Sequence, residues 1–270
     1  MAIFVIAEIG VNHDGSLEKA KRLIDAAALA GADAVKFQHF SSERLWGDLR
    51  IAHLELAEEE LTALAGYGGG PEFMCTPFGV PEVEFLAPLV KRMKVASGCL
   101  RRSELLRAVA ATGLPVILST GMSTLSDVSA ALVDLRRQDV LHRRAPGEIT
   151  LLHCTSAYPC PVEAVNLWAM ATLAGYFMLP VGYSDHTAGI TVSIAAAAMG
   201  AKVIEKHLTL NRSAAGPDHK ASIEPEEFRV MVNAIRTVEA ALGNGVKLVQ
   251  PCEEKLRRAW REPVSSHSSA

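Results

Sequence analysis

Residues 182–210 read GYSDHTAGITVSIAAAAMGAKVIEKHLTL, two short apolar runs with an alanine-rich stretch between them. The apolar runs predict strands at Pro180–Tyr183 and Lys202–Ile204, and the stretch that begins at Gly189 predicts a helix. Strand, helix and strand in this order are typical of a βαβ unit, whose two strands lie parallel. Each strand leads directly into a polar cluster, so both clusters are expected at the same edge of the sheet.

The same unit recurs along the chain. Six further strands are predicted, at Phe4–Glu8, Ala34–Phe37, Glu72–Cys75, Arg92–Val95, Pro115–Leu118 and Ile149–His153. Helical stretches are predicted to begin near Leu17, Ala57, Val80, Ser103, Leu125 and Val162, and a last one to span Pro225–Leu242. Eight unbroken βα units predict an α/β fold, a single-domain (β/α)8 TIM barrel over residues 1–245. A doubly wound open sheet is the alternative, but its glycine-rich GxGxxG loop is absent from the sequence.

Two segments depart from this alternation. Residues 39–56 form a polar connection after the second strand, and this connection is either a lid over the barrel mouth or an ordinary surface loop. Residues 246–270 are expected to form a C-terminal helix and a Ser-rich tail whose composition is typical of disorder.

The composition of the 270 residues excludes several classes of function. The net charge of −3 argues against a nucleic-acid partner. No apolar run reaches 18 residues and the N-terminus has no charged region before its apolar residues, so neither a membrane span nor a signal peptide is expected. The five cysteines are odd in number and form no CxxC, which indicates reduced thiols in a cytoplasmic protein.

Polar residues follow nearly every predicted strand, and in a barrel they converge on one face, where the active site lies. Two lysines, Lys36 and Lys94, stand there among hydroxyl side chains, a combination that suits a phosphate or carboxylate anion. The alternative is that these lysines pair with glutamates to hold strands together. The candidate binding residues at the strand ends are Glu8, Asn12, Gln38, Thr76, Ser97, Ser119, Ser156, Tyr158, Ser184 and Asp185.

His186 and His207 follow neighbouring strands at equivalent positions. Two imidazoles with carboxylates nearby can hold a divalent metal that keeps open positions for substrate. The alternative for each is a hydrogen-bonded core histidine. Their equivalent placement favours the metal.

The sequence resembles the N-acetylneuraminate (sialic acid) synthase family. The resemblance rests on AEIGVNHDGS, VKFQ, CTPFG, KVASG, ILSTGMST, LLHCTSAYP, GYSDHT and VIEKHLTL followed by GPDH, in this order between residue 3 and about residue 245. The family condenses phosphoenolpyruvate with an N-acylated amino sugar in a divalent-metal-dependent, aldol-type reaction. CTSAYP, with Ser156, is more similar to the bacterial nonulosonate and spore-coat branches than to the sialic acid synthases.

The resemblance implies roles for individual residues. His186 and His207 would hold the metal, usually Mn2+, with Mg2+, Co2+, Zn2+ or Fe2+ as alternatives. Glu8 would be the catalytic acid or base, and Tyr158 and Asp218 would face the sugar. The residues expected around phosphoenolpyruvate are Lys36, Thr76, Lys94, Ser97, Ser119, Ser156 and Ser184.

Three departures from the family pattern all concern the acceptor. The family continues into a small antifreeze-like domain that reaches into the partner's site in a dimer. We expect that domain to be naturally absent from this chain rather than cut off, and a homodimer is implied by the resemblance alone. Cys99 stands where glutamate often follows the KxxSG motif, and the connection after the second strand is short.

Two other classes of function stay open at this point. One is a class I aldolase with Lys36, Lys94 or Lys206 as its Schiff-base nucleophile. The other is a non-catalytic homologue that binds phosphoenolpyruvate or a sugar.

Overall fold

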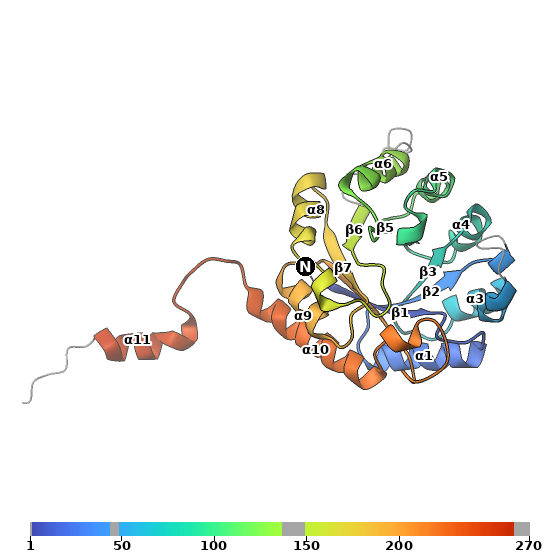
Figure 1. Ribbon diagram of the computed structural model, residues 1–270. Helices are drawn as coiled ribbons and strands as arrows, with labels where there is room; N and C mark the ends of the chain where they lie inside the picture. Colours follow the sequence, from blue (N-terminus) through green and yellow to red (C-terminus); the bar gives the residue numbers. More distant parts are fainter. Residues whose placement is uncertain (1, 44–48, 137–148, 262–270) are drawn as a thin grey trace, which may run out of the picture.

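The structure, a computed structural model, describes residues 2–43, 49–136 and 149–261. Eight parallel strands form one sheet at the centre of the molecule (Figure 1). They are β1 (Phe4–Gly10), β2 (Ala34–His39), β3 (Glu72–Pro77), β4 (Met93–Val95), β5 (Val116–Ser119), β6 (Ile149–His153), β7 (Val181–Asp185) and β8 (Val203–His207). Each predicted strand is therefore present, and several run one to three residues further at their C-terminal ends.

The sheet curls into a nearly closed barrel. Its strand order is β3-β2-β1-β8-β7-β6-β5-β4. Within the described ranges no hydrogen-bonded ladder joins β3 to β4, although these two strands lie in contact and complete the ring. In β1, Glu8 is in register with Lys36 of β2 on one side and with His207 of β8 on the other. The barrel therefore places residues from opposite ends of the chain side by side.

Helices surround the barrel, one after nearly every strand (Figure 1). They are α1 (Leu17–Leu29), α3 (Glu58–Ala65), α4 (Val80–Leu86), α5 (Ser103–Ala111), α6 (Leu125–Arg136), α8 (Ala169–Phe177), α9 (Thr191–Ala198) and α10 (Pro225–Leu242). One predicted start is wrong, because Val162–Ala164 forms only a 3-10 turn and α8 begins at Ala169. Asn166 has φ +51°, which interrupts a right-handed helix at that point.

Alternation along the strands separates two apolar layers. In β1, Val5, Ala7 and Ile9 pack outward against the surrounding helices. Ile6 faces inward and meets its counterparts on five other strands, Ala34, Met74, Ile117, Leu152 and Val203. Since side chains repeat every second residue, the same alternation points Glu8 inward, one layer above Ile6. The inner apolar layer around Ile6 therefore closes the bottom of the space that lies between the C-terminal ends of the strands.

The connection at 39–56 is described apart from residues 44–48. Its C-terminal part forms a 3-10 helix, η1 (Leu49–Leu54). Phe40 and Leu54 from this segment pack with Val11 in a small apolar cluster at the barrel mouth. A role as a lid stays a prediction.

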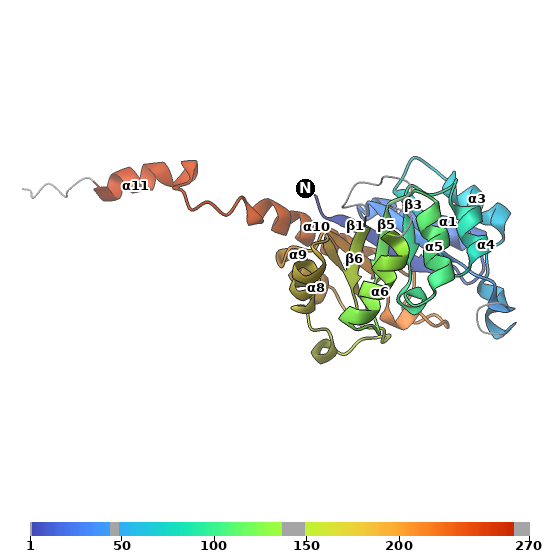
Figure 2. The same ribbon diagram turned by 90° about the horizontal axis from the view of Figure 1, so that it is seen from above.

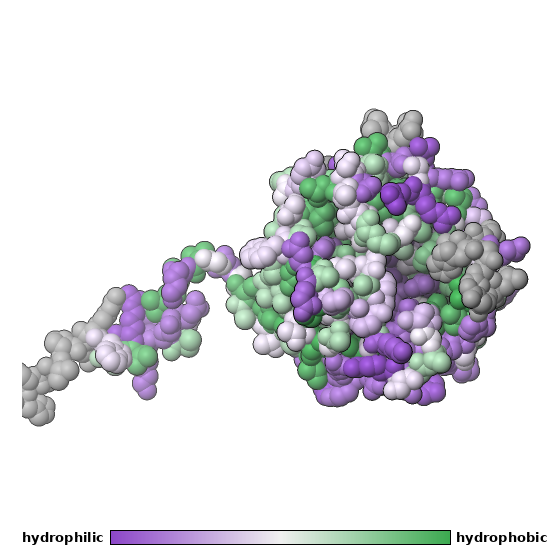
Figure 3. Space-filling view, viewed as in Figure 1, coloured by the Kyte–Doolittle hydropathy of each residue, from purple (hydrophilic) through white to green (hydrophobic). Residues whose placement is uncertain are grey.

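Beyond α10 the chain leaves the barrel as an extended arm that ends in α11 (Glu254–Arg261) (Figures 1 and 2). A helix is thus present where the C-terminal helix was expected, and the Ser-rich tail lies outside the described residues. Figure 3 shows the arm as mainly hydrophilic with a few apolar side chains, and Leu248 and Leu256 on it are exposed. None of the helices in the described part of the chain has both the length and the apolar character that crossing a membrane requires.

Candidate active site

A cavity of about 380 Å³ lies at the C-terminal ends of the strands. Its walls come from both lysine-bearing strands and from both histidine-bearing segments. Of the residues predicted from the sequence, the lining includes Glu8, Lys36, Gln38, Thr76, Lys94, Ser97, Ser119, Ser156, Tyr158, Ser184, His186, His207 and Asp218. The barrel therefore brings together side chains that are as far apart as residues 8 and 218.

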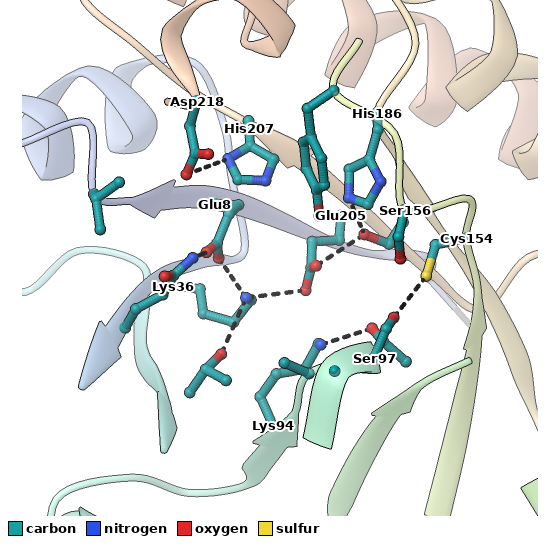
Figure 4. Close-up of a pocket in the computed structure, with 18 of the residues that line it drawn as sticks. Glu8, Lys36, Lys94, Ser97, Cys154, Ser156, His186, Glu205, His207 and Asp218 are labelled. Carbon is teal, nitrogen blue, oxygen red and sulfur yellow. Dashed lines mark hydrogen bonds and ion pairs between the residues drawn. The ribbon is translucent and has the colours of Figure 1, made fainter. Parts of the chain in front are cut away.

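Lys36 lies between two carboxylates at the base of the cavity (Figure 4). Its Nζ is 2.5 Å from Glu8 Oε2 and 3.5 Å from Glu205 Oε2, and it donates to Thr76 Oγ1 at 3.2 Å. Glu8, Lys36 and Glu205 are all buried. Bringing charges out of water is costly, so this cluster is stable only because acidic and basic groups face one another.

The two carboxyl groups of this cluster have different pKa values. Burial, reinforced by the negative charge of Glu205, raises the pKa of Glu8 to about 7 against the opposing effect of Lys36. For Glu205, burial is outweighed by the charges of Lys36 and Lys94, which with a hydrogen bond from Ser184 hold its pKa at about 2. Glu8 can therefore exchange a proton near neutral pH while Glu205 stays ionised. Such a divergence is typical of an acid/base site.

A second group of donors lies around Lys94. Its Nζ donates to Ser119 Oγ at 2.7 Å, and Ser97 Oγ accepts a hydrogen bond from the amide of Gly121 at 3.0 Å. A Cβ on Gly121 would lie 2.4 Å from Ser156 Oγ, so any larger residue at this position would displace these hydroxyls. Figure 4 shows Lys94, Ser97 and Ser156 on the same side of the cavity. One ammonium group among several hydroxyls suits an anion such as phosphate or carboxylate.

The imidazoles of His186 and His207 face each other across 5.8 Å between ring centroids. Burial lowers the pKa of both, that of His186 to about 4, so both are neutral at pH 7. His186 Nδ1 lies 2.7 Å from the carbonyl oxygen of Thr155, which fixes the proton on that nitrogen and leaves Nε2 as the acceptor. Tyr158 covers the pair, with its ring centroid 4.1 Å from that of His186.

These two histidines fit a divalent metal as a partial ligand set. His207 Nδ1 is buried and makes no hydrogen bond to any described residue, although Asp218 Oδ2 lies 3.7 Å away. Across the described ranges no three histidine, cysteine or acidic side chains converge as a preformed metal site. Two neutral imidazoles thus offer lone pairs, and water or substrate would complete the coordination. This is the open arrangement that a catalytic metal needs.

Two predicted substrate-binding residues lie outside the cavity lining. Asp185 is fully buried, and its carboxylate is bonded to Thr187, Ser193 and Lys206. It follows Ser184 on β7, so strand alternation directs it away from the cavity. The expectation that Asp185 contacts substrate is therefore corrected. The same geometry removes Lys206, its partner, from the candidates for a Schiff base.

Asn12 is the second correction. Its Nδ2 donates to the carbonyl oxygen of Leu208 at 2.9 Å and to Ser222 Oγ at 2.8 Å. The amide therefore joins the connection after β1 to the connection after β8. Asn12 therefore stabilises the loops around the mouth of the barrel and does not line the cavity.

Glu205 lies in the polar cluster that follows the eighth predicted strand, but its role was not predicted from the sequence. Alternation along β8 was the available signal, because Val203 lines the barrel interior and Glu205 and His207 share its face. An apolar wall at the mouth of the cavity was not predicted either; it is formed by Val11, Phe40, Ile51, Leu54 and Phe78. No pattern in the sequence links these residues.

Cys75, Cys99 and Cys154 are free and buried, and burial raises the pKa of each thiol. They are small core residues.

Comparison with known proteins identifies relatives of this chain. The NeuB family model matches residues 23–247. The N,N'-diacetyllegionaminic acid synthase of Legionella pneumophila is 42% identical over 98% of this chain and 80% of its own length. The spore coat polysaccharide biosynthesis protein SpsE of Bacillus subtilis is 36% identical over 94% and 72%. The crystal structure of the N-acetylneuraminic acid (sialic acid) synthetase of Leptospira borgpetersenii serovar Hardjo-bovis superimposes with a TM-score of 0.88 at 35% identity, over 96% of this chain and 91% of that one.

Proposed function

Because the chain belongs to the NeuB family, we propose that it condenses phosphoenolpyruvate with the aldehyde of an N-acylated amino sugar or a related sugar. The products are inorganic phosphate and a 2-keto acid of the nonulosonic type. The observation that carries the proposal is Lys36 between Glu8 and Glu205 at the base of the cavity, with Lys94 beside them. This arrangement supplies both the positive charge that phosphoenolpyruvate needs and a carboxyl group that titrates near neutral pH.

Phosphoenolpyruvate carries a phosphate and a carboxylate, and the cavity has a cationic group for each. Lys94 with Ser97, Ser119 and Ser156 forms one set of donors, and Lys36 with Thr76 forms another. Between these sets the enol carbons would lie next to Glu8 and Glu205. We assign the opposite side of the cavity, lined by Tyr158, Asp218 and the apolar mouth, to the acceptor.

The reaction forms a bond from C3 of phosphoenolpyruvate to the aldehyde carbon, and positive charge develops at C2. Glu205, held ionised, stabilises that charge. Water then adds to C2, and Glu8 accepts its proton, a role that suits a pKa near 7. The tetrahedral intermediate expels phosphate by cleavage of the bond from C2 to the phosphate oxygen, and the C2 hydroxyl gives its proton to the departing phosphate as it becomes the keto oxygen. The proton that Glu8 took from water passes to the alkoxide formed from the aldehyde. Of Lys36 and Lys94, the lysine beside the phosphate balances the growing charge on the leaving group, and the other holds the carboxylate.

A divalent ion, for which we propose Mn2+, would be held by His186 and His207 and would polarise the aldehyde oxygen as a Lewis acid. The neutral state of both imidazoles and the unpartnered Nδ1 of His207 support this assignment. Mg2+, Co2+, Zn2+ and Fe2+ are the alternatives that metal replacement would separate. The free thiols support a cytoplasmic location, and the family resemblance supports a homodimer.

Phosphate release tests this function. The protein is incubated with phosphoenolpyruvate, Mn2+ and a panel of N-acylated hexosamines and other aldehydes, with and without EDTA. Release that depends on an acceptor and stops with EDTA is expected. Binding of phosphoenolpyruvate without release for any acceptor would favour the non-catalytic homologue.

One observation keeps the class I aldolase as a second candidate, because burial lowers the pKa of Lys94 and so favours a nucleophilic amine. Borohydride with a carbonyl substrate separates the two functions. The synthase leaves no covalent adduct, whereas an adduct on Lys94 would establish the aldolase.

A further inference from the structure

The residues that directly precede the two histidines form a buried ion pair. Asp185 of β7 and Lys206 of β8 are register partners, and Lys206 Nζ lies 3.1 Å from Asp185 Oδ2. Neither side chain is exposed to solvent. His186 and His207 each follow one member of this pair, so the pair links the two backbone positions from which the imidazoles project.

Further hydrogen bonds fix the pair on both sides of His186. Lys206 Nζ donates to the carbonyl oxygen of Thr187 at 2.6 Å. Asp185 Oδ1 accepts from both the amide and the hydroxyl of Thr187 at 2.8 Å, and Oδ2 accepts from Ser193 Oγ of α9 at 2.6 Å. The backbone on either side of His186 is therefore bonded to β8 and to α9. A shift of the His186 backbone relative to β8 would therefore break these bonds.

On the outward-facing side of the two strands, the positions that precede this pair are occupied by apolar side chains. Two residues earlier on each strand, Tyr183 of β7 and Ile204 of β8 are register partners within the main apolar core. Burying an ion pair carries a large desolvation cost, and apolar residues of similar volume usually stabilise a fold as well or better. Asp185 and Lys206 also lie outside the cavity lining. Neither general stability nor substrate contact therefore accounts for a charged pair at this place.

We propose that Asp185 and Lys206 are positioning residues that set the spacing of His186 and His207 and thereby the affinity for the divalent metal. The proposal rests on the proposed function, because it assumes that the two imidazoles are the metal ligands. Groups that hydrogen-bond to metal ligands and orient them typically change metal affinity by about 10- to 100-fold when they are altered. For a pair that acts on the ligands through the backbone, we expect a loss near the lower end of that range.

The test measures Mn2+ and Co2+ binding by titration calorimetry, and the visible absorption of bound Co2+, in four proteins. These are the wild type, Asp185→Asn, Lys206→Met and the double variant, which removes both charges and leaves no unpaired buried ion. Metal affinity is expected to fall at least tenfold in each single variant, with an altered Co2+ spectrum. Because the pair acts as one unit, the double variant should lose no more than the worse single variant. Phosphoenolpyruvate affinity should stay within about twofold of the wild type.

Glu72→Gln is the matched control. Glu72, at the start of β3, forms an ion pair at 2.7 Å with Arg92, which precedes β4. Both residues lie at the N-terminal ends of their strands, whereas the histidines lie at the C-terminal ends of β7 and β8, so loss of this pair should leave metal affinity unchanged. Ser193→Ala removes one bond to Asp185 and provides a milder variant should Lys206→Met not fold; a two- to fourfold loss is expected. The positioning role would be overturned if the wild type binds metal and Asp185→Asn, Ser193→Ala and the double variant all bind it with the same affinity. Absence of metal binding in the wild type would instead contradict the metal in the proposed function.

Discussion

Nε2 of His219 lies 3.0 Å from Oδ1 of Asp14, which joins the last connection of the barrel to the first across 205 residues of sequence. A carboxylate only accepts hydrogen bonds, so Nε2 carries a proton and donates to Asp14. On the other side of the ring, Nδ1 lies 2.7 Å from the hydroxyl oxygen of Thr209. His219 is buried and directly follows Asp218, which lines the acceptor side of the cavity. The bond therefore fixes the turn that presents Asp218.

His219→Leu should loosen this turn while it keeps an apolar side chain of similar volume in the buried position. The KM for the acceptor is expected to rise about tenfold, while the affinity for phosphoenolpyruvate stays within twofold, because Asp218 is on the acceptor side. Lys19→Met is the control: Lys19 forms an ion pair with Asp14 at the surface but does not touch His219. Equal KM values for His219→Leu and the wild type would show that the turn holds without this bond.

Glu8→Gln should abolish turnover without abolishing binding. The amide preserves the size of the side chain but cannot accept the proton of the attacking water, and general-base catalysis contributes about 10²- to 10⁴-fold. We expect kcat to fall by about that factor while calorimetry still detects both phosphoenolpyruvate and metal. Turnover close to the wild-type rate would remove Glu8 from the mechanism.

The raised pKa of Glu8 also predicts how stability depends on pH. The folded state favours the neutral carboxyl, so the stabilisation is present below the ordinary value of 4.5 and is lost as pH rises through about 7. The amide that replaces this carboxyl in the Glu8→Gln protein does not titrate. Between pH 5 and pH 8, urea unfolding should therefore show the Glu8→Gln protein gaining about 2 kcal/mol relative to the wild type. A difference that does not change with pH would mean that Glu8 is ionised throughout this range.

Gly121→Ala should weaken phosphoenolpyruvate binding at the anion site around Lys94. The new methyl group would lie 2.4 Å from Ser156 Oγ and 2.9 Å from Ser97 Oγ, which displaces two donors of the phosphoenolpyruvate site. A loss of at least tenfold in phosphoenolpyruvate affinity is expected by calorimetry. Gly175→Ala on α8 is the control, since nothing lies within 4 Å of its added methyl group. Equal affinities in the two variants would contradict the placement of the anion beside Ser97 and Ser156.

The barrel was predictable because each strand is a short apolar run of its own, bounded by polar residues. The same pattern predicts where each strand ends. Polar residues at these ends converge on one face of a barrel, so Lys36, Lys94, His186 and His207 could be assigned to one site. The false helix start at Val162 arose because apolar and polar spacing does not reveal a positive φ at Asn166.

The direction in which a side chain points was harder to predict than its position in the chain. Ser184 and Asp185 are neighbours, yet only Ser184 lines the cavity, because the pleat of β7 sends Asp185 to the other face. Asn12 and His219 help to form the mouth through hydrogen bonds between residues that are 196 and 205 positions apart in the sequence. Such contacts follow from closure of the barrel, which brings its first and last connections together, and no local pattern encodes them.

The oxygen content of the released phosphate shows whether water attacks C2 of phosphoenolpyruvate, as the proposed condensation requires. The protein, phosphoenolpyruvate, Mn2+ and an accepted aldehyde are incubated in H2¹⁸O, and the phosphate is analysed by mass spectrometry at early times. Addition of water at C2 followed by cleavage of the C2–O bond predicts phosphate without ¹⁸O, formed in equal amount to a new 2-keto acid. One ¹⁸O atom in each phosphate would mean that water attacks phosphorus, and would contradict a condensation carried out by Glu8, Lys36 and Glu205.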